Sequence, residues 1–221
     1  MDEQMKSEPL AANLDGLTAA LQAAAFLSSP TYLDVIQIED EQERSQALAW
    51  FFGLRLGLAR MCGCEIYGDM LGEDVLCSLV LQPPGCAASA WQMVRAGILR
   101  VPLALGIGTM RRLLKTIGFL DSNKARLGRN DLAACFELQM VVVIPAAQGL
   151  SHGSRILKHV LSERVDPLGA AVILDTQLEA NVRFYERLGF KVIAKDRRDD
   201  DSYTSWVMLR ESPSVARQGP K

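Results

Sequence analysis

The chain has 221 residues, a length that suits one domain of about 200 residues and allows a core without disulfides. Hydrophobic residues make up 49% and charged residues 23% of the sequence, which excludes wholesale disorder. The net charge of −2 and the aromatic content of 6% argue against a basic nucleic-acid surface or a stacking platform for single strands. We therefore expect a globular protein with no nucleic-acid partner.

No targeting or membrane-spanning signal is recognisable in the sequence. The first residues lack the basic start and apolar run of a signal peptide. The longest uncharged stretch, residues 75–94, contains Pro83-Pro84-Gly85, which would break a spanning helix in its middle. We expect a cytoplasmic protein with no membrane partner.

The five cysteines show no regular spacing, so they do not indicate a secreted disulfide framework. Cys62-Gly63-Cys64 could supply half of a metal site, but zinc sites need further paired ligands and the sequence has only two histidines. We expect reduced, mostly buried thiols and no metal.

The pattern indicates one domain over residues 9–211, between a flexible N-terminus of residues 1–8 and a flexible tail of residues 212–221. The polar run 121–131 predicts a loop and a candidate internal boundary, but the parts on either side do not look independent. No internal repeat is evident.

Two helices and a hairpin are predicted in the first part of the chain. Residues 15–27 are rich in Ala and Leu, and residues 41–61 repeat apolar positions at steps of three and four. Residues 62–67 and 75–81 read as strands, with a glycine-bearing turn at 68–74 between them.

Residues 88–120 read as helical in pieces, with interruptions near Pro102 and Gly106-Ile107-Gly108. The apolar residues of this stretch could either cover the sheet or line a binding pocket.

A strand, a glycine-bearing loop and a helix follow one another in the second half. Residues 135–144 form an apolar, β-branched run that ends at Pro145, and the loop 146–154 precedes an amphipathic helix. The inward positions of that helix are Ile156, Leu157, Val160 and Leu161. A helix N-terminus offers unpaired amides and partial positive charge, and small residues allow close approach, so the loop suits a phosphate. Glycine is also common in ordinary strand-to-helix turns.

The remaining elements alternate in the same way. Residues 169–175 read as a buried strand, and residues 176–188 as a helix that Gly189-Phe190 ends. Further strands are predicted over residues 191–194 and 203–210.

Two motifs at this spacing resemble the GNAT N-acetyltransferase superfamily. They are residues 148–153 after a strand and, about thirty residues on, Asn181-x-x-Phe184-Tyr185-x-x-x-Gly189-Phe190. Trp91 and Trp206-x-Met208-x-Arg210 are similar to its small-molecule branch, which includes puromycin-type N-acetyltransferases. The specific part of the resemblance covers residues 135–210.

The resemblance implies an α/β (α+β) fold with a mixed, mostly antiparallel central sheet and helices on both faces. It also implies transfer of an acetyl group from acetyl-CoA to an amine of a small molecule by direct attack on the thioester. The acceptor and the oligomeric state are not indicated.

In such a protein, acetyl-CoA lies in a V-shaped gap between the strand 136–143 and the strand 169–175. The resemblance implies these cofactor-binding residues: Val141, Val142 and Val143 along the pantetheine arm, Gln148, Gly149, Leu150, Ser151, His152, Gly153 and Ser154 at the diphosphate, and Asn181 on the CoA arm.

Tyr185 is the implied proton donor to the leaving thiolate. Asn181 and Tyr185 are four residues apart and therefore share one helix face, and a positioned hydroxyl donor suits thiolate expulsion. The alternative is that Tyr185 only caps the core.

Glu137 is our candidate general base, directly or through a water. An unbulged strand would place it on one face with Gln139 and Val141, and a bulge would re-aim it. It could instead be a solvated strand-end residue.

The sequence departs from the family pattern in two ways. Ser151 stands where the loop has glycine, and a left-handed Ser would cost about 1–2 kcal/mol. The fourth strand also lacks a histidine that many relatives carry. These departures favour an alternative, a degenerate, non-catalytic member that binds acyl-CoA or a partner protein.

A nucleotide-binding α/β module is a second alternative. Such a module has Gly-x-Gly-x-x-Gly after its first strand, and Gly106-Ile107-Gly108 lacks the third glycine.

The run Asp199-Asp200-Asp201 could attract a cationic acceptor or form a solvated turn.

Overall fold

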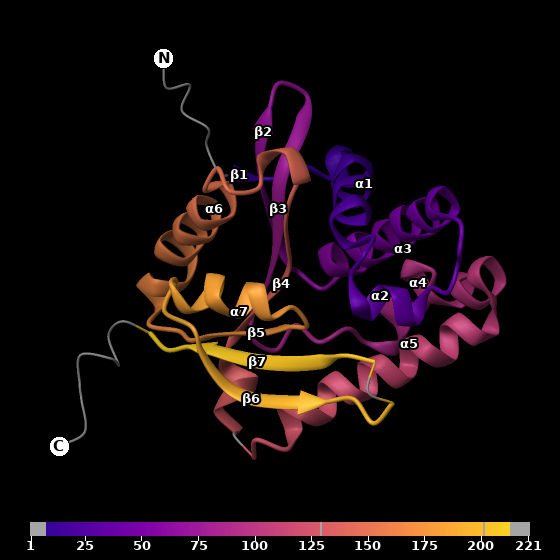
Figure 1. Ribbon diagram of the computed structural model, residues 1–221. Helices are drawn as coiled ribbons and strands as arrows, with labels where there is room; N and C mark the ends of the chain where they lie inside the picture. Colours follow the sequence, from indigo (N-terminus) through magenta and orange to yellow (C-terminus); the bar gives the residue numbers. More distant parts are fainter. Residues whose placement is uncertain (1–7, 129, 201, 213–221) are drawn as a thin grey trace.

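The computed structural model describes residues 8–128, 130–200 and 202–212 (Figure 1). The chain ends that the sequence predicts to be flexible lie outside these residues, except for Glu8, which pairs with Gly68, and Ser212, which is buried. The helices are α1 (Asp15–Phe26), α2 (Pro30–Val35), α3 (Glu41–Met61), α4 (Ala90–Ala96), α5 (Val101–Ala125), α6 (His152–Val160) and α7 (Glu179–Glu186). The strands are β1 (Glu8–Pro9), β2 (Glu65–Leu71), β3 (Asp74–Gln82), β4 (Phe136–Val143), β5 (Val172–Thr176), β6 (Lys191–Arg197) and β7 (Thr204–Arg210).

The strands form one sheet in the order β1-β2-β3-β4-β5-β7-β6. The β4–β5 pair is parallel and the other neighbouring pairs are antiparallel. The mixed, mostly antiparallel sheet with helices on both faces is therefore confirmed (Figure 1).

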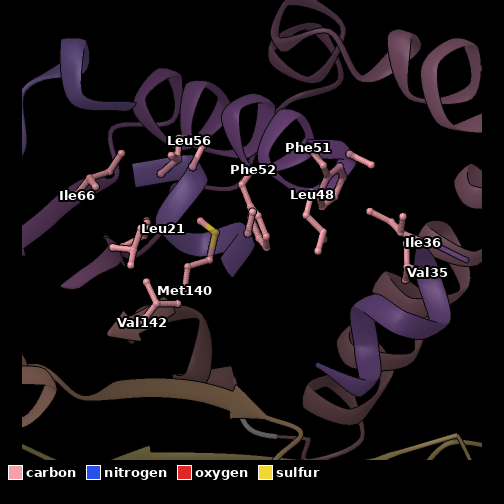
Figure 2. Packing of buried hydrophobic residues seen from close by; sticks show 14 of the residues in the cluster. Leu21, Val35, Ile36, Leu48, Phe51, Phe52, Leu56, Ile66, Met140 and Val142 are labelled. Atoms are coloured by element: carbon pink, nitrogen blue, oxygen red, sulfur yellow. The ribbon is translucent and has the colours of Figure 1, made fainter. Parts of the chain in front are cut away.

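Each face of the sheet has its own hydrophobic cluster. On one face, α1 and α3 pack on the central strands, with Phe52 of α3 beside Met140 and Leu21 of α1 beside Val142 of β4 (Figure 2). On the other face, α6 and α7 bury an apolar set that comprises Ile156, Leu157, Val160, Val182 and Tyr185. The centre of the sheet is thus covered on both faces, which explains why β3 and β4 are so rich in apolar residues.

Local signals set the bounds of α3, which agree with the prediction. The Asp40 carboxylate caps the helix by accepting a hydrogen bond of 2.8 Å from the Glu43 amide. At the other end, Gly63 has a φ of +77°, a conformation that glycine adopts freely.

The predicted turn at 68–74 is wrong except at residues 72–73, because β2 continues to Leu71 and β3 begins at Asp74. A Cβ at Gly68 would lie 2.7 Å from Leu10 Cδ1 and 2.8 Å from the Cys77 carbonyl, so this glycine allows a close approach inside the sheet. Asp69 is fully buried and pairs with Arg155 across 2.8 Å. Tertiary partners therefore hold two typical turn residues in a strand.

The predicted loop at 121–131 is wrong at its start, because α5 runs to Ala125. The polar residues of this last turn have partners in the fold: Asn123 accepts a hydrogen bond of 2.6 Å from Arg126, and Lys124 forms ion pairs described below. The interruption at Gly106 is confirmed by its φ of 84° and ψ of 155° within α5.

The short helix α2 is missing from the prediction. Pro30 begins this helix rather than ending the previous one, since the first turn of a helix tolerates a missing N–H.

Within the described ranges, no single helix is long and apolar enough to cross a membrane. The pair Ala90–Ala96 and Ile98–Ala125 meets the length and composition criteria together, with a bend of 56° between its parts.

Candidate active site

The parallel strands β4 and β5 separate soon after they begin. Their pairing is confined to Phe136 with Val172 and Glu137 with Ile173. Beyond Glu137, β4 remains paired to β3 as far as Val143, and no other described strand pairs with its opposite edge. The backbone groups on that edge are therefore available to an extended ligand. This opening lies where the sequence analysis expects acetyl-CoA.

A β-bulge interrupts β4 at Met140. The register against β3 shifts between Ser78 and Val80, and Met140 has a φ of +50°. Before the bulge, Phe136 and Leu138 face the α6 side; after it, Met140 and Val142 face the α1 side.

The side-chain alternation therefore reverses along the strand. The condition of an unbulged strand is not met, and Glu137 and Gln139 lie on the face opposite Val141 and Val143. The bulge that the sequence analysis names as the other possibility is present. Glu137 lies on the face of the sheet that α1 and α3 cover.

The loop between β4 and α6 has the shape of an anion site. Gly149 and Ser151 have φ values of +80° and +67°, and α6 begins at His152. In the part of the chain that the structure describes, the amides of Gly149, Ser151, His152, Gly153 and Ser154 have no hydrogen-bond acceptor. Unpaired amides at a helix N-terminus form a site for a phosphate, so the residues present fit a diphosphate.

Gly153 brings α6 close to the open edge of β4. A Cβ at this position would lie 3.1 Å from Val143 Cγ2, so a larger residue would push the helix away from the strand. Gln148 ties the loop to the same strand through a 3.3 Å hydrogen bond to the Val143 carbonyl. The free amides and the open strand edge are thereby held side by side.

Ser151 adopts the left-handed conformation, which costs a residue other than glycine about 1–2 kcal/mol. We expect Ser151→Gly to raise the free energy of unfolding by about 0.5–1 kcal/mol, because glycine removes a strain of about 1–2 kcal/mol but adds unfolded-state entropy. Urea denaturation checks this value.

The matched control is Ser122→Gly in α5, where the backbone is helical. This change is expected to lower the free energy of unfolding by about 0.5–1 kcal/mol. Equal losses in both variants would show that Ser151 is not strained.

A charged network anchors the first turn of α6 to β2. The Arg155 guanidinium lies 2.8 Å from the buried Asp69 carboxylate and 2.9 Å from His152 Nδ1. Arg155 remains 47% exposed, so its positive charge adds to the partial charge of the helix N-terminus beside the loop.

Asn181 and Tyr185 lie on α7, next to the end of β5. Asn181 donates a hydrogen bond of 3.2 Å to the Thr176 hydroxyl. Tyr185 is buried, with its ring 5.1 Å from Phe184 and 5.7 Å from Phe190. Among the described residues its hydroxyl has no hydrogen-bond partner. Burial, with a smaller contribution from the Asp175 carboxylate, raises the pKa of Tyr185, so the hydroxyl keeps its proton at neutral pH.

Glu137 is neither free nor simply solvated. Lys124 Nζ lies 2.8 Å from its carboxylate and 3.1 Å from that of Asp175. Burial alone would lower the pKa of Lys124, but the Asp175 and Glu137 carboxylates outweigh it and raise that pKa. One ammonium thus joins α5, β4 and β5 at the narrow end of the opening.

Sequence reasoning missed Lys124, Asp175 and Gln177. Gln177 donates to Asp175 across 3.1 Å and lies 3.3 Å from the Thr31 hydroxyl. Asp175 follows the three apolar residues 172–174 of β5, and a polar residue at the end of a buried strand could have indicated it. No local pattern could reveal Lys124, because it sits in a run that reads as a loop.

A cavity of about 190 Å³ lies on the Glu137 side of β4 and is bordered by Gln139, Met140 and Arg55. Arg55 donates to the Tyr32 hydroxyl across 2.7 Å, and Gln139 donates to Gln82 across 3.0 Å. A larger groove of about 560 Å³ lies between α6 and β2, and none of the predicted site residues lines it. The smaller cavity adjoins the bulge.

Cysteines also line this smaller cavity. Its walls include Cys62, Cys64 and Cys86, and burial raises the pKa of Cys64 to about 12. The five cysteines are not in disulfides. In the described residues, no group of three or more His, Cys, Asp and Glu side chains could hold a metal ion.

The acidic run before β7 has a structural role at Asp200. Its carboxylate lies 3.1 Å from Lys115 Nζ and 3.1 Å from Arg198 Nε. These contacts fit the turn interpretation rather than recruitment of a cationic acceptor. Asp201 lies outside the described residues.

Residues 108–192 match the family model described as an acetyltransferase (GNAT) domain. No curated protein matches the chain significantly.

Several solved structures share the fold over most of the chain. A structure described as histone acetyltransferase HPA2 and related acetyltransferase, from Corynebacterium glutamicum, has a TM-score of 0.68 at 18% identity, covering 94% of this chain and 96% of that one. Polyamine N-acetyltransferase from Drosophila melanogaster has a TM-score of 0.57 at 15% identity, covering 93% and 99%. PaiA N-acetyltransferase from Thermoplasma acidophilum, solved with coenzyme A, has a TM-score of 0.54 at 10% identity, covering 93% and 98%.

Proposed function

Because residues 108–192 match a GNAT acetyltransferase domain model and the fold is shared with a solved acetyltransferase structure, we propose that the chain transfers an acetyl group from acetyl-CoA to an amine of a small molecule. One observation carries the proposal: the open edge of β4 adjoins a loop whose amides have no acceptor within the described residues. An extended arm with a diphosphate at one end matches that combination.

Acetyl-CoA supplies the activated thioester when bound. The residues proposed to hold it are the β4 backbone at Val141–Val143, the amides of 149–154, and Asn181. That the Thermoplasma structure contains coenzyme A supports this choice of donor. Arg155, half-exposed beside the loop, adds a cation for the diphosphate.

Tyr185 is the proposed proton donor to the leaving thiolate. Its raised pKa keeps the hydroxyl protonated, and the hydroxyl has no competing partner among the described residues. A thiol has an ordinary pKa of about 8.5, so a departing thiolate is a good hydrogen-bond acceptor for a neutral hydroxyl even before proton transfer is complete.

The amine is proposed to enter from the cavity beside the bulge, on the face where Glu137 lies. Glu137 remains our candidate for removing the amine proton, through a water, while Lys124 orients its carboxylate. The Drosophila relative is named for polyamines, and amines of that class suit the first screen.

The test combines titration calorimetry with a turnover assay. We expect acetyl-CoA to bind in the micromolar range, free CoA to bind comparably, and ATP to bind far more weakly. Release of CoA thiol is then followed with a panel of polyamines, amino sugars and amino acids. Absence of acetyl-CoA binding would contradict the donor site, and binding without thiol release would contradict transfer to these amines.

One observation favours a second candidate, a non-catalytic acyl-CoA binder. Lys124 already engages the Glu137 carboxylate in an ion pair at 2.8 Å, so this carboxylate has a structural partner in place of a substrate proton. In that case acetyl-CoA would bind, but none of the amines would accelerate thiol release over the rate without amine.

A further inference from the structure

Large exposed apolar side chains are concentrated on α4, on α5 and on the turn between them. These elements lie at the margin of the molecule (Figure 1). The exposed fractions are 72% for Trp91, 61% for Leu99, 87% for Leu103, 67% for Ile107 and 60% for Leu114. Single exposed leucines need no explanation, but five large apolar residues exposed on consecutive elements between positions 91 and 114 are a concentration, the apolar patch, that calls for a partner.

The exposed residues of α5 follow the helical period. Ile107, Arg111 and Leu114 are spaced by four and three residues and therefore lie along one outward stripe. Thr109 and Leu113 are buried against the rest of the protein. The helix is thus anchored by one face while its opposite face carries apolar and basic side chains to the surface.

The charge of this region has one sign. Between Val75 and Leu120 the sequence holds five basic residues and no acidic one, although the whole chain has a net charge of −2. Arg95, Arg100 and Arg111 are exposed, and within the described part of the chain none of them has an ion-pair partner. The apolar patch therefore includes three exposed arginines without an ion-pair partner among the described residues, whereas Lys115 farther along α5 pairs with Asp200.

We propose that this patch docks on an anionic membrane surface. The α4–α5 surface comprises Trp91, Arg95, Leu99, Arg100, Leu103, Ile107, Arg111 and Leu114. Apolar side chains among unpaired cations match a bilayer interface, where acyl chains lie beneath negatively charged headgroups. A second copy of the same surface would bring like charges together, which disfavours a symmetric dimer through this face.

The geometry indicates docking along the membrane rather than insertion through it. The helix pair is bent by 56°, and the buried face of α5 keeps it attached to the protein. Peripheral binding would run against the sequence-based expectation of no membrane partner. It does not depend on the proposed enzymatic function.

Vesicle flotation of the full chain tests the proposal. We expect binding to vesicles of phosphatidylcholine with phosphatidylserine, little binding to phosphatidylcholine alone, and weaker binding as the salt concentration rises. Binding that does not differ between the two vesicle types would overturn the charge argument.

Variants of the exposed residues locate the binding face without disturbing the core. The triple change R95E/R100E/R111E is expected to lower the partition coefficient by on the order of 100-fold, and L103E/I107E by at least about 10-fold. The controls are Leu168→Glu, with a wild-type exposure of 68%, and Lys191→Glu, each of which places one change of the same kind elsewhere and is compared with the single variants Leu103→Glu and Arg111→Glu.

Two results would overturn the proposal. One is that wild-type protein fails to bind anionic vesicles; the other is that the controls reduce binding as much as the α4–α5 variants do. Sedimentation of each variant is measured in parallel. Loss of a dimer in L103E/I107E, without vesicle binding by the wild type, would assign the surface to self-association instead.

Discussion

Replacement of Tyr185 by Phe is expected to lower kcat/KM for acetyl transfer by about 10²–10⁴-fold, the usual contribution of a positioned proton donor. The affinity for acetyl-CoA should stay unchanged, because the ring and its packing against Phe184 and Phe190 remain. Calorimetry and thiol-release kinetics on the same preparation separate the two effects.

The fold should not suffer from this change, since the Tyr185 hydroxyl has no hydrogen-bond partner among the described residues. Tyr67→Phe is the matched control: it also removes a hydroxyl from a buried tyrosine, one that bonds Glu65 on β2. If Tyr185→Phe keeps the wild-type rate, the residue only fills the core, as the alternative interpretation of the sequence holds.

Lys124→Met should have the largest effect on stability. The side chains of Lys124, Glu137 and Asp175 are only 20–26% exposed, and removal of the ammonium leaves two carboxylates facing each other. Breaking a fully buried pair costs about 3–5 kcal/mol, so for these partly exposed groups we expect a loss of about 2–3 kcal/mol in the free energy of unfolding. Denaturant titration measures the difference.

The sign of the pH dependence follows from the raised pKa of Lys124. Stability from a group with a raised pKa is fully present below its unfolded-state value, about 10.4 for lysine, and is lost only as pH rises through the folded-state value. The difference between wild type and Lys124→Met should therefore be the same at about pH 7 and about pH 9.

Lys115→Met is the control, because the Lys115–Asp200 pair is solvent-exposed and should contribute no more than about 1 kcal/mol. Similar losses in both variants would mean that Lys124 is an ordinary surface lysine.

Two strained residues lie in the region proposed to bind acetyl-CoA. In the described residues, the non-glycine residues with positive φ are Met140 and Ser151, and both lie along the expected path of acetyl-CoA. Met140 re-aims the side chains of β4, and Ser151 turns the chain into α6. Such conformations persist where the surrounding structure over-determines them, often at functional sites.

The sequence by itself determined the elements whose signals are local. The cap at Asp40 and the glycine after Met61 bound α3, and the order of strand, glycine-bearing loop and helix around Gly149 was readable in the same way. The spacing of Asn181 and Tyr185 on one helix was readable too. These features depend on neighbours within about four residues, which a single sequence displays.

Only the tertiary structure decided the features that depend on distant partners. Gly68 and Asp69 stay in a strand because Leu10, Cys77 and Arg155 surround them. The separation of β4 from β5 and the bulge at Met140 arise from pairing between strands far apart in sequence. Lys124 meets Glu137 and Asp175 across thirteen and fifty-one residues of chain, so the charge balance of the site exists only once the sheet has formed.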